Sequence, residues 1–191
     1  MRRLVIITFL LIVTVPGRAQ TPPPSEIVYL HQQGAVRIEL APLPLDVIRA
    51  FYGGRGFDKP YIEAFVSKGC VFRADIGNSN TTPNAPPVQI DLSRWRRDTG
   101  DGPSPIPLKE TWLADFAKRG MALPQQTAFR WATFPNLQTF QAGDFNWGML
   151  PFSYSPGTTF DLVIWWKEGK KEHTAEMKGL TCASPSSSSP P

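Results

Sequence analysis

Histidine and methionine are the residue types through which this chain could bind a transition metal. His173 and Met177 are four positions apart in a segment with strand-like alternation, and such positions share one face of a strand. Met149 lies in the stretch FNWGML, and His31 lies in an expected turn. Imidazole and thioether ligands suit copper, so these four residues form a candidate copper site if the fold gathers them. The alternative is that Met149 fills a gap in the core and that His173 and Met177 face solvent.

Tryptophan side chains are candidates for contact with a binding partner. Trp147 lies in the sequence DFNWG, and Trp165 and Trp166 are adjacent in an expected strand. Neighbouring strand residues point to opposite faces, so one of the two enters the core and the other faces outward or covers a second layer. An exposed ring beside the proline-rich loops would form a platform for a partner chain or a glycan. The alternative is that loops and helices cover these rings, because most tryptophans are largely buried.

Arginine residues offer two further candidates for binding an anion. Arg55 lies in the sequence GGRG (residues 53–56), where glycines are also typical of a helix end followed by a turn. Arg94, Arg96 and Arg97 surround Trp95 next to acidic residues, a pattern that favours a solvated strand end over a phosphate site.

Catalytic motifs give no assignment in this sequence. No serine lies in a G-x-S-x-G motif, and the chain contains no HExxH, CxxCH, GxGxxG or P-loop pattern. We therefore name no catalytic residue and no cofactor apart from the copper hypothesis. A secreted hydrolase stays open as an alternative function, because the spatial separation of carboxylates cannot be derived from sequence.

The two cysteines, Cys70 and Cys182, predict a disulfide. Neither has a second cysteine or a histidine at the spacing of a redox or metal motif. In an oxidising compartment an even pair is typical of a structural bridge. Such a bridge would join the first third of the fold to its last strand.

The N-terminus predicts a cleavable secretory signal peptide over residues 1–19. Arg2 and Arg3 precede a twelve-residue apolar run, and small residues stand before a cut at Gln20. The apolar run would span only about 18 Å as a helix, which is short of a bilayer core of about 30 Å. We therefore expect a periplasmic or secreted protein with no membrane span after cleavage.

Loss of the signal peptide removes most of the net charge. The full chain has 20 Lys and Arg against 16 Asp and Glu, a formal charge of +4, and three arginines belong to residues 1–19. The remaining chain is close to +1, which argues against a nucleic-acid partner, because such proteins need a basic face.

The remaining chain divides into a single domain and two loose ends. Residues 20–25 form a proline-rich leader and residues 183–191 a Ser/Pro tail, and both are predicted to be disordered. Residues 26–182 are long enough for one β-rich domain with its own core.

Alternating apolar and polar residues predict most of this domain to be strands. The expected strands cover residues 27–30, 35–40, 70–76, 88–92, 127–134, 137–140, 159–166 and 173–182. Glycine between the last two predicts a hairpin. Helical spacing and stop signals predict short helices over residues 44–52, 58–66 and 108–119.

These elements predict an antiparallel β-sandwich, immunoglobulin-like or similar, with short helices in the connections. The alternative is an α+β domain whose helices pack on one sheet face. The sequence thus favours an exported, non-catalytic β-rich domain that binds another protein or assists an assembly outside the cytoplasm. The alternatives are a copper-handling protein and a secreted hydrolase.

Overall fold

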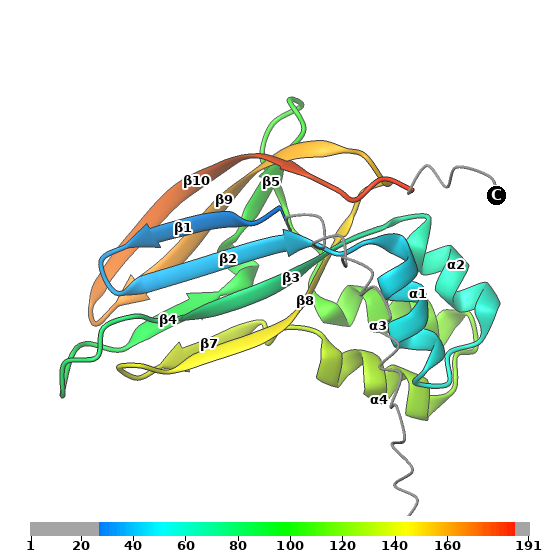
Figure 1. Ribbon diagram of the computed structural model, residues 1–191, viewed down its shortest axis with the longest axis horizontal. Coiled ribbons are helices and arrows are strands. Elements are labelled where there is room, and N and C mark those ends of the chain that lie inside the picture. Colours follow the sequence, from blue (N-terminus) through cyan, green and yellow to red (C-terminus); the bar gives the residue numbers. More distant parts are fainter. Residues whose placement is uncertain (1–26, 186–191) are drawn as a thin grey trace, which may run out of the picture.

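The computed structural model describes residues 27–185, and within them two antiparallel β-sheets face each other across a shared core (Figure 1). The predicted signal peptide (residues 1–19), leader (residues 20–25) and most of the tail lie outside the described residues. Among residues 27–185, no helix is long and apolar enough to cross a membrane. The predicted antiparallel β-sandwich is confirmed.

The first sheet, called the four-stranded sheet from here on, is built from strands with a strict inward and outward alternation. Val36, Ile38 and Leu40 point inward and are buried, whereas Arg37 and Glu39 point outward. The order of its strands across the described part of the chain is β1 (Tyr29–Gln33), β2 (Val36–Pro42), β3 (Gly69–Asn78) and β8 (Phe145–Ser153).

The second sheet, called the six-stranded sheet, is organised around β9 (Thr159–Glu168). β10 (Lys171–Thr181) pairs with one edge of β9, and β4 and β5 pair one after the other with its second edge. A 3-10 turn, η1 (Leu92–Arg94), separates these two strands. The other members described are β4 (Val88–Asp91), β5 (Arg96–Asp98), β6 (Ser104–Pro105) and β7 (Leu137–Phe140).

Aromatic side chains fill the space between the sheets. The rings of Phe72, Phe152 and Phe160 contact one another with centroids 4.8–6.0 Å apart. Trp95 and Trp166 are fully buried, and the Trp95 indole N–H donates to the Trp165 carbonyl over 2.9 Å. Buried aromatic rings of this kind supply a large share of the apolar area that stabilises a core.

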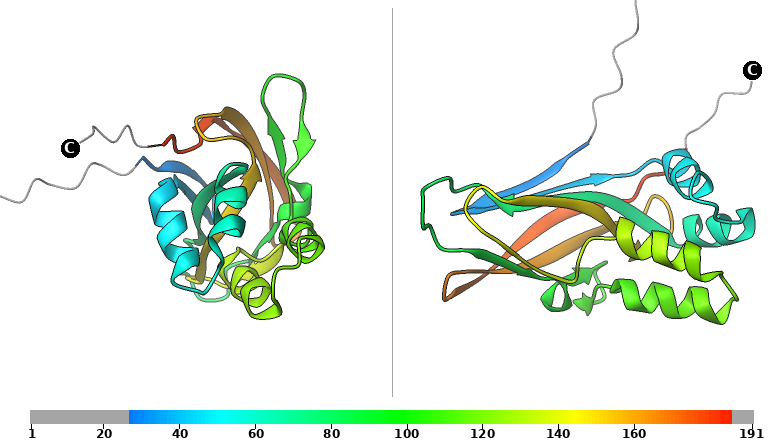
Figure 2. Two further views of the ribbon diagram at one scale, coloured as in Figure 1. Left: turned by 90° about the vertical axis from the view of Figure 1, so that its right-hand side faces the viewer. Right: turned by 90° about the horizontal axis from the view of Figure 1, so that it is seen from below.

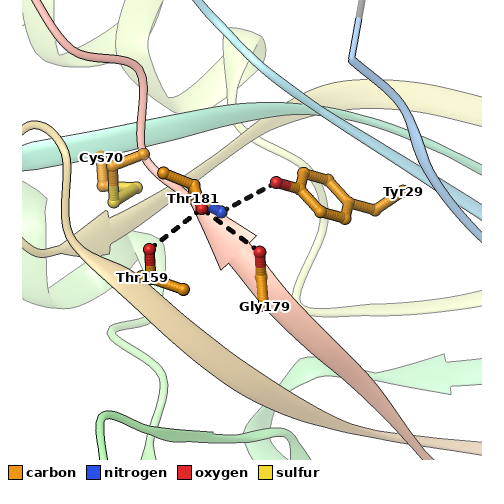
Figure 3. The surroundings of a disulfide bond; sticks show 6 residues. Tyr29, Cys70, Thr159, Gly179 and Thr181 are labelled. Carbon is orange, nitrogen blue, oxygen red and sulfur yellow. Dashed lines mark hydrogen bonds between the residues drawn. A yellow bond between two sulfur atoms is a disulfide. The ribbon is translucent and has the colours of Figure 1, made fainter.

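A disulfide between Cys70 and Cys182 joins the two sheets, as predicted from the sequence (Figure 3). Cys70 lies at the start of β3, and Cys182 directly follows β10. Next to the bridge, the Thr181 amide donates to the Tyr29 hydroxyl over 3.1 Å, which ties the last strand to the first. The hydroxyls of Thr159 and Thr181 also lie within hydrogen-bond distance, at 3.0 Å.

Helices cover one end of the outer face of the four-stranded sheet and leave its other end uncovered (Figures 1 and 2). Val71 and Met149 point outward from β3 and β8 into a second core that the helices complete. At its centre the buried Tyr52 hydroxyl donates to the Met149 sulfur over 3.4 Å, and burial raises the pKa of Tyr52 well above its usual range. The helices described are α1 (Leu45–Gly53), α2 (Lys59–Val66), α3 (Lys109–Lys118) and α4 (Leu123–Ala132). This packing on one sheet face is the feature expected of the α+β alternative.

The largest differences from the sequence-based expectation concern α4 and β8, and the short strands β5 and β6 were not predicted either. Residues 127–134, predicted to be a strand, belong mostly to α4, because Pro124 begins a helix well and the buried Gln125 and Phe129 share one helical face. The strand β8 was not predicted, because Gly148 and Pro151 are typical of loops. Both residues are tolerated because β8 is the last strand in the described order of the four-stranded sheet. On its outer side a proline, which has no N–H, leaves no hydrogen bond to a neighbouring strand unmade.

The turn between the first two strands is shorter than expected. Gln33 pairs with Val36, so the turn consists of Gly34 and Ala35, and Gly34 has the positive φ (+59°) that a tight hairpin of this type requires. His31 therefore lies on β1 and not in a turn, contrary to the prediction.

Removal of the disulfide should destabilise the domain strongly. The bridge closes a loop of 112 residues, for which the chain-entropy model gives a stabilisation of about 4–5 kcal/mol. We expect the Cys70→Ala/Cys182→Ala variant to lose most of this free energy of unfolding in urea titrations. Addition of a reductant should destabilise the wild type to the same extent and leave the double variant unchanged. An equal response of both proteins to the reductant would contradict the assignment.

Candidate binding surface

The uncovered end of the four-stranded sheet presents two rows of outward-facing residues. Strand register aligns Glu39, Asp75 and Trp147 in one row. The next row aligns Arg37, Gly77 and Phe145. Cross-strand neighbours on one face of a sheet lie within direct contact range, so each row forms a continuous strip across three strands.

Three large aromatic side chains stand exposed beside these rows. The exposed fractions are 75% for Phe145, 58% for Trp147 and 84% for Trp131. Phe145 and Trp147 are two positions apart on β8 and therefore share its outer face, about 6.6 Å apart along the strand. Trp131, near the end of α4, lines the same hollow as Trp147. We call these three side chains the aromatic platform.

Gly77 on β3 determines where Phe145 of the aromatic platform lies. A β-carbon on Gly77 would lie 2.8 Å from the β-carbon of Phe145 and 2.6 Å from the Asp144 carbonyl oxygen. The absence of a side chain at this position is what permits Phe145 to lie against β3. Any other residue would push Phe145 away from the sheet.

Two ion pairs lie alongside the platform. Arg37 pairs with Glu39 on β2, and Arg73 pairs with Asp75 on β3 over 2.9 Å between Nε and Oδ2. All four side chains are partly exposed, so the pairs contribute little to stability. The charges within each pair are opposite, and an ionised carboxylate that accepts through one oxygen can accept from a ligand hydroxyl through its other oxygen.

A cleft of about 500 Å³ extends from the platform between the loops at the end of β3 and before β8. Its wall includes Phe145 and Asp75, and its rim includes Ser79, Thr81 and Asp144. The volume falls in the range of about 300–1,000 Å³ that is usual for small-ligand sites.

The buried Asn78 holds these loops in place. Its side-chain amide donates to the carbonyls of Pro86 and Phe140 over 3.2 and 3.4 Å, and its carbonyl oxygen accepts from the Asn80 amide over 3.1 Å. Its backbone amide donates to the Asp144 carbonyl over 2.9 Å. One buried polar side chain thus connects the two loops that line the cleft.

The structure separates the three tryptophans that the sequence singled out. Trp147 is exposed on the platform, whereas Trp165 and Trp166 are both buried. Trp166 points into the core between the sheets, and Trp165 is covered by the Arg94 guanidinium, which lies 4.0 Å from the centre of its ring. Arg94 also pairs with Glu172 over 3.0 Å, so this member of the three arginines around Trp95 has a structural role.

Arg55 follows α1 in the turn that its flanking glycines form. Its guanidinium lies 3.4 Å from the centre of the Phe51 ring and donates to the Phe51 carbonyl over 3.0 Å. Gly56 has a positive φ of +76°, as a turn after a helix requires. These contacts belong to the helix end and lie outside the aromatic platform.

The two histidines converge on one tryptophan, although 142 positions separate them. The His31 and His173 ring centroids lie 5.2 and 5.1 Å from that of Trp166, and His173 stacks almost parallel to it. The Nε2 atoms of both histidines and the Trp166 Nε1 atom are buried without a hydrogen-bond partner. We call these three residues the histidine cluster. It lies where β1 and β10 border the core.

The two methionines of the candidate copper set lie away from the histidine cluster. Met177 is four positions from His173, which corresponds to about 13 Å along a strand and is too far for a shared metal ion. Met149 is buried on the opposite side of the four-stranded sheet, next to Tyr52. Among the described residues, no group of three or more His, Cys, Asp or Glu side chains could hold a metal ion.

Sequence reasoning did not single out most of the platform. Phe145 and Trp147 alternate with Asn146 in a way that is typical of a strand, but the neighbouring glycine and proline favoured a loop. Trp131 was assigned to an expected strand. Asp75 and Glu39 lay in strands that were correctly predicted, and only the register between those strands shows that they face the same way as Trp147.

Aromatic faces beside paired charges and a cleft lined by polar side chains form a surface suited to binding. Comparison with known proteins adds no further information, because no family model, no curated protein and no solved structure matches the chain significantly. The function must therefore be argued from this surface.

The histidine cluster predicts a loss of stability in mild acid. Burial lowers the pKa of His31 below its ordinary value of 6.5, so the unfolded chain binds a proton that the folded chain resists. The free energy of unfolding should therefore fall as the pH drops below about 6.5. Urea titrations at pH 7.5, 6.5 and 5.5 would measure this change. The His31→Gln variant should show a flatter profile, and an unchanged profile would contradict the prediction.

Proposed function

We propose that this chain is an exported, non-catalytic interaction domain that binds its partner through the aromatic platform. The observation that carries this proposal is the exposure of Phe145 and Trp147 on the outer face of β8, with the exposed Trp131 lining a hollow beside Trp147. Large apolar side chains gathered on a surface are typical of binding sites. Burying them against a partner removes apolar surface from water, which lowers the free energy of the complex.

The scaffold below the platform supports this proposal. Phe145 and Trp147 stand on a strand that pairs with β3 over nine residue pairs, and Asn78 fixes the adjacent loops. A rigid surface loses little conformational entropy on binding, which favours affinity.

The export of the protein is supported by two independent features. The first is the signal-peptide pattern of residues 1–19. The second is the Cys70–Cys182 disulfide, since such bonds persist in oxidising compartments. A periplasmic or secreted domain fits both.

The platform can be tested with a matched pair of surface variants. We expect Phe145→Ala/Trp147→Ala to keep a melting temperature close to that of the wild type, because both rings are largely in water. The immobilised variant should lose the material that wild-type protein retains from the extracytoplasmic fraction of its native cells. Leu123→Ala removes an exposed apolar side chain from α4 and should retain that material. Equal retention by all three proteins would contradict the proposal.

A second candidate function, copper handling, is favoured by the histidine cluster. Two imidazoles with unpartnered Nε2 atoms pack on one tryptophan, and imidazole is a ligand that suits copper. A hollow of about 410 Å³ between the β1–β2 and β9–β10 turns reaches His173. The ligand set proposed here is His31 and His173, without Met149 and Met177.

Thermal melts with and without copper would test this second function. Binding of Cu(I) to the folded chain should raise the melting temperature by several degrees, because a ligand that binds only the native state stabilises it. The increase should disappear in His31→Gln/His173→Gln and persist in Met177→Leu. An increase that survives in the histidine double variant, or no increase in the wild type, would rule out this site.

A further inference from the structure

We infer that the ligand of the aromatic platform is a neutral polysaccharide whose pyranose rings present a flat C–H face. This inference rests on the proposed function, since it names the chemistry that the same surface recognises. It draws on the arrangement of the rings, the balance of charge, and the polar groups of the adjacent cleft.

The rings are placed to stack along an extended chain. Phe145 and Trp147 occupy successive outward positions on β8, and Trp131 and Trp147 line a common hollow. The face of an aromatic ring carries partial negative charge and attracts the polarised C–H groups of a pyranose, while the flat contact excludes water. A row of rings therefore suits a polymer of flat units better than a single compact ligand.

The charges on the surface favour a neutral ligand. Arg37 and Arg73 are each paired with a carboxylate of their own strand, and Asp144 adds a further acidic group at the cleft. Lys109 and Arg130 line the hollow beside Trp131 and Trp147, so the surface as a whole stays close to neutral. An anionic polymer would require an excess of basic side chains, as nucleic-acid binding does. The surface beside Phe145 offers no such excess among the residues that line the cleft.

The cleft supplies the hydrogen bonds that a sugar needs. Asp75 uses Oδ2 to accept from Arg73, and an ionised carboxylate has a second oxygen that can accept from ligand hydroxyls. Glu39 is likewise paired with Arg37 through one oxygen, Oε1, and Ser79 and Thr81 contribute hydroxyls to the lining of the cleft. Carboxylates and hydroxyls next to aromatic faces match a ligand that carries hydroxyls around an apolar ring.

A folded protein partner fits this surface less well. The centre of a protein interface is depleted in charged residues, and its aromatic anchors enter pockets that are fully dried on binding. Here Glu39 and Asp75 lie in the same cross-strand row as Trp147, and Arg37 lies in the row of Phe145. The partner of Asp75, Arg73, lies in the next row. Docking of a protein would bury these charges, whereas hydroxyl groups would replace the water that now surrounds them.

Isothermal titration calorimetry with defined oligosaccharides tests the inference. Full-length mature protein would be titrated with cellohexaose, chitohexaose and, as a polyanionic control, dextran sulfate. We expect binding of at least one neutral oligosaccharide and none of dextran sulfate. Trp147→Ala should weaken binding about tenfold, as expected for loss of one aromatic contact. Trp147→Phe should retain most of the affinity, and Leu123→Ala should bind like the wild type.

Absence of heat with both neutral oligosaccharides, or equal affinity of Trp147→Ala and wild type, would overturn the inference. The retention experiment with the Phe145→Ala/Trp147→Ala variant separates this outcome from failure of the proposed function. Platform-dependent retention of a protein without oligosaccharide binding would overturn the polysaccharide and leave the interaction domain standing. Loss of platform dependence in both experiments would overturn both.

Discussion

The pairing of β3 with β8 controls the rest of the structure, because each strand contributes to three environments at once. Inward side chains such as Phe72 and Phe152 enter the core between the sheets. Outward side chains at one end, Val71 and Met149, enter the helical core. Outward side chains at the other end form the aromatic platform. A slip of one residue in this register would exchange inner and outer faces and place Phe145 and Trp147 among the core residues.

Two glycines allow the chain to pass closely at this pairing. A β-carbon on Gly148 would lie 2.8 Å from the backbone of Phe134, where the chain leaves α4 and crosses β8. Gly77 plays the corresponding part beneath Phe145. Gly77 thus permits the close approach on the outer face of the strand pair, and Gly148 permits it on the inner face, where Phe134 belongs to the core between the sheets. This arrangement gives the exposed rings a rigid base without any added layer.

The open edge beside β1 and β10 contrasts with this well-packed region. The histidine cluster places three ring nitrogens in the interior with no hydrogen-bond partner, which carries a free-energy cost in a folded protein. The Tyr29–Thr181 hydrogen bond holds the first and last strands together, and the disulfide beside it joins the end of β10 to β3 (Figure 3). The covalent link thus secures the last strand, which also carries His173, to the four-stranded sheet.

The sequence by itself determined those features that depend on local pattern. Alternation identified β2, β3, β4 and β9, glycine placed the β9–β10 hairpin, and the single pair of cysteines predicted the disulfide. Only the tertiary structure decided that residues 127–132 are helical, that FNWGMLPFS is a strand, and that Trp165 and Trp166 are both buried. Alternation shows that adjacent residues face opposite ways, but which faces are covered depends on distant segments. The platform is exposed because the helices cover only the other end of the four-stranded sheet and do not reach Phe145 and Trp147. How far the helices extend over the sheet is set by the packing of segments that are far apart in the chain.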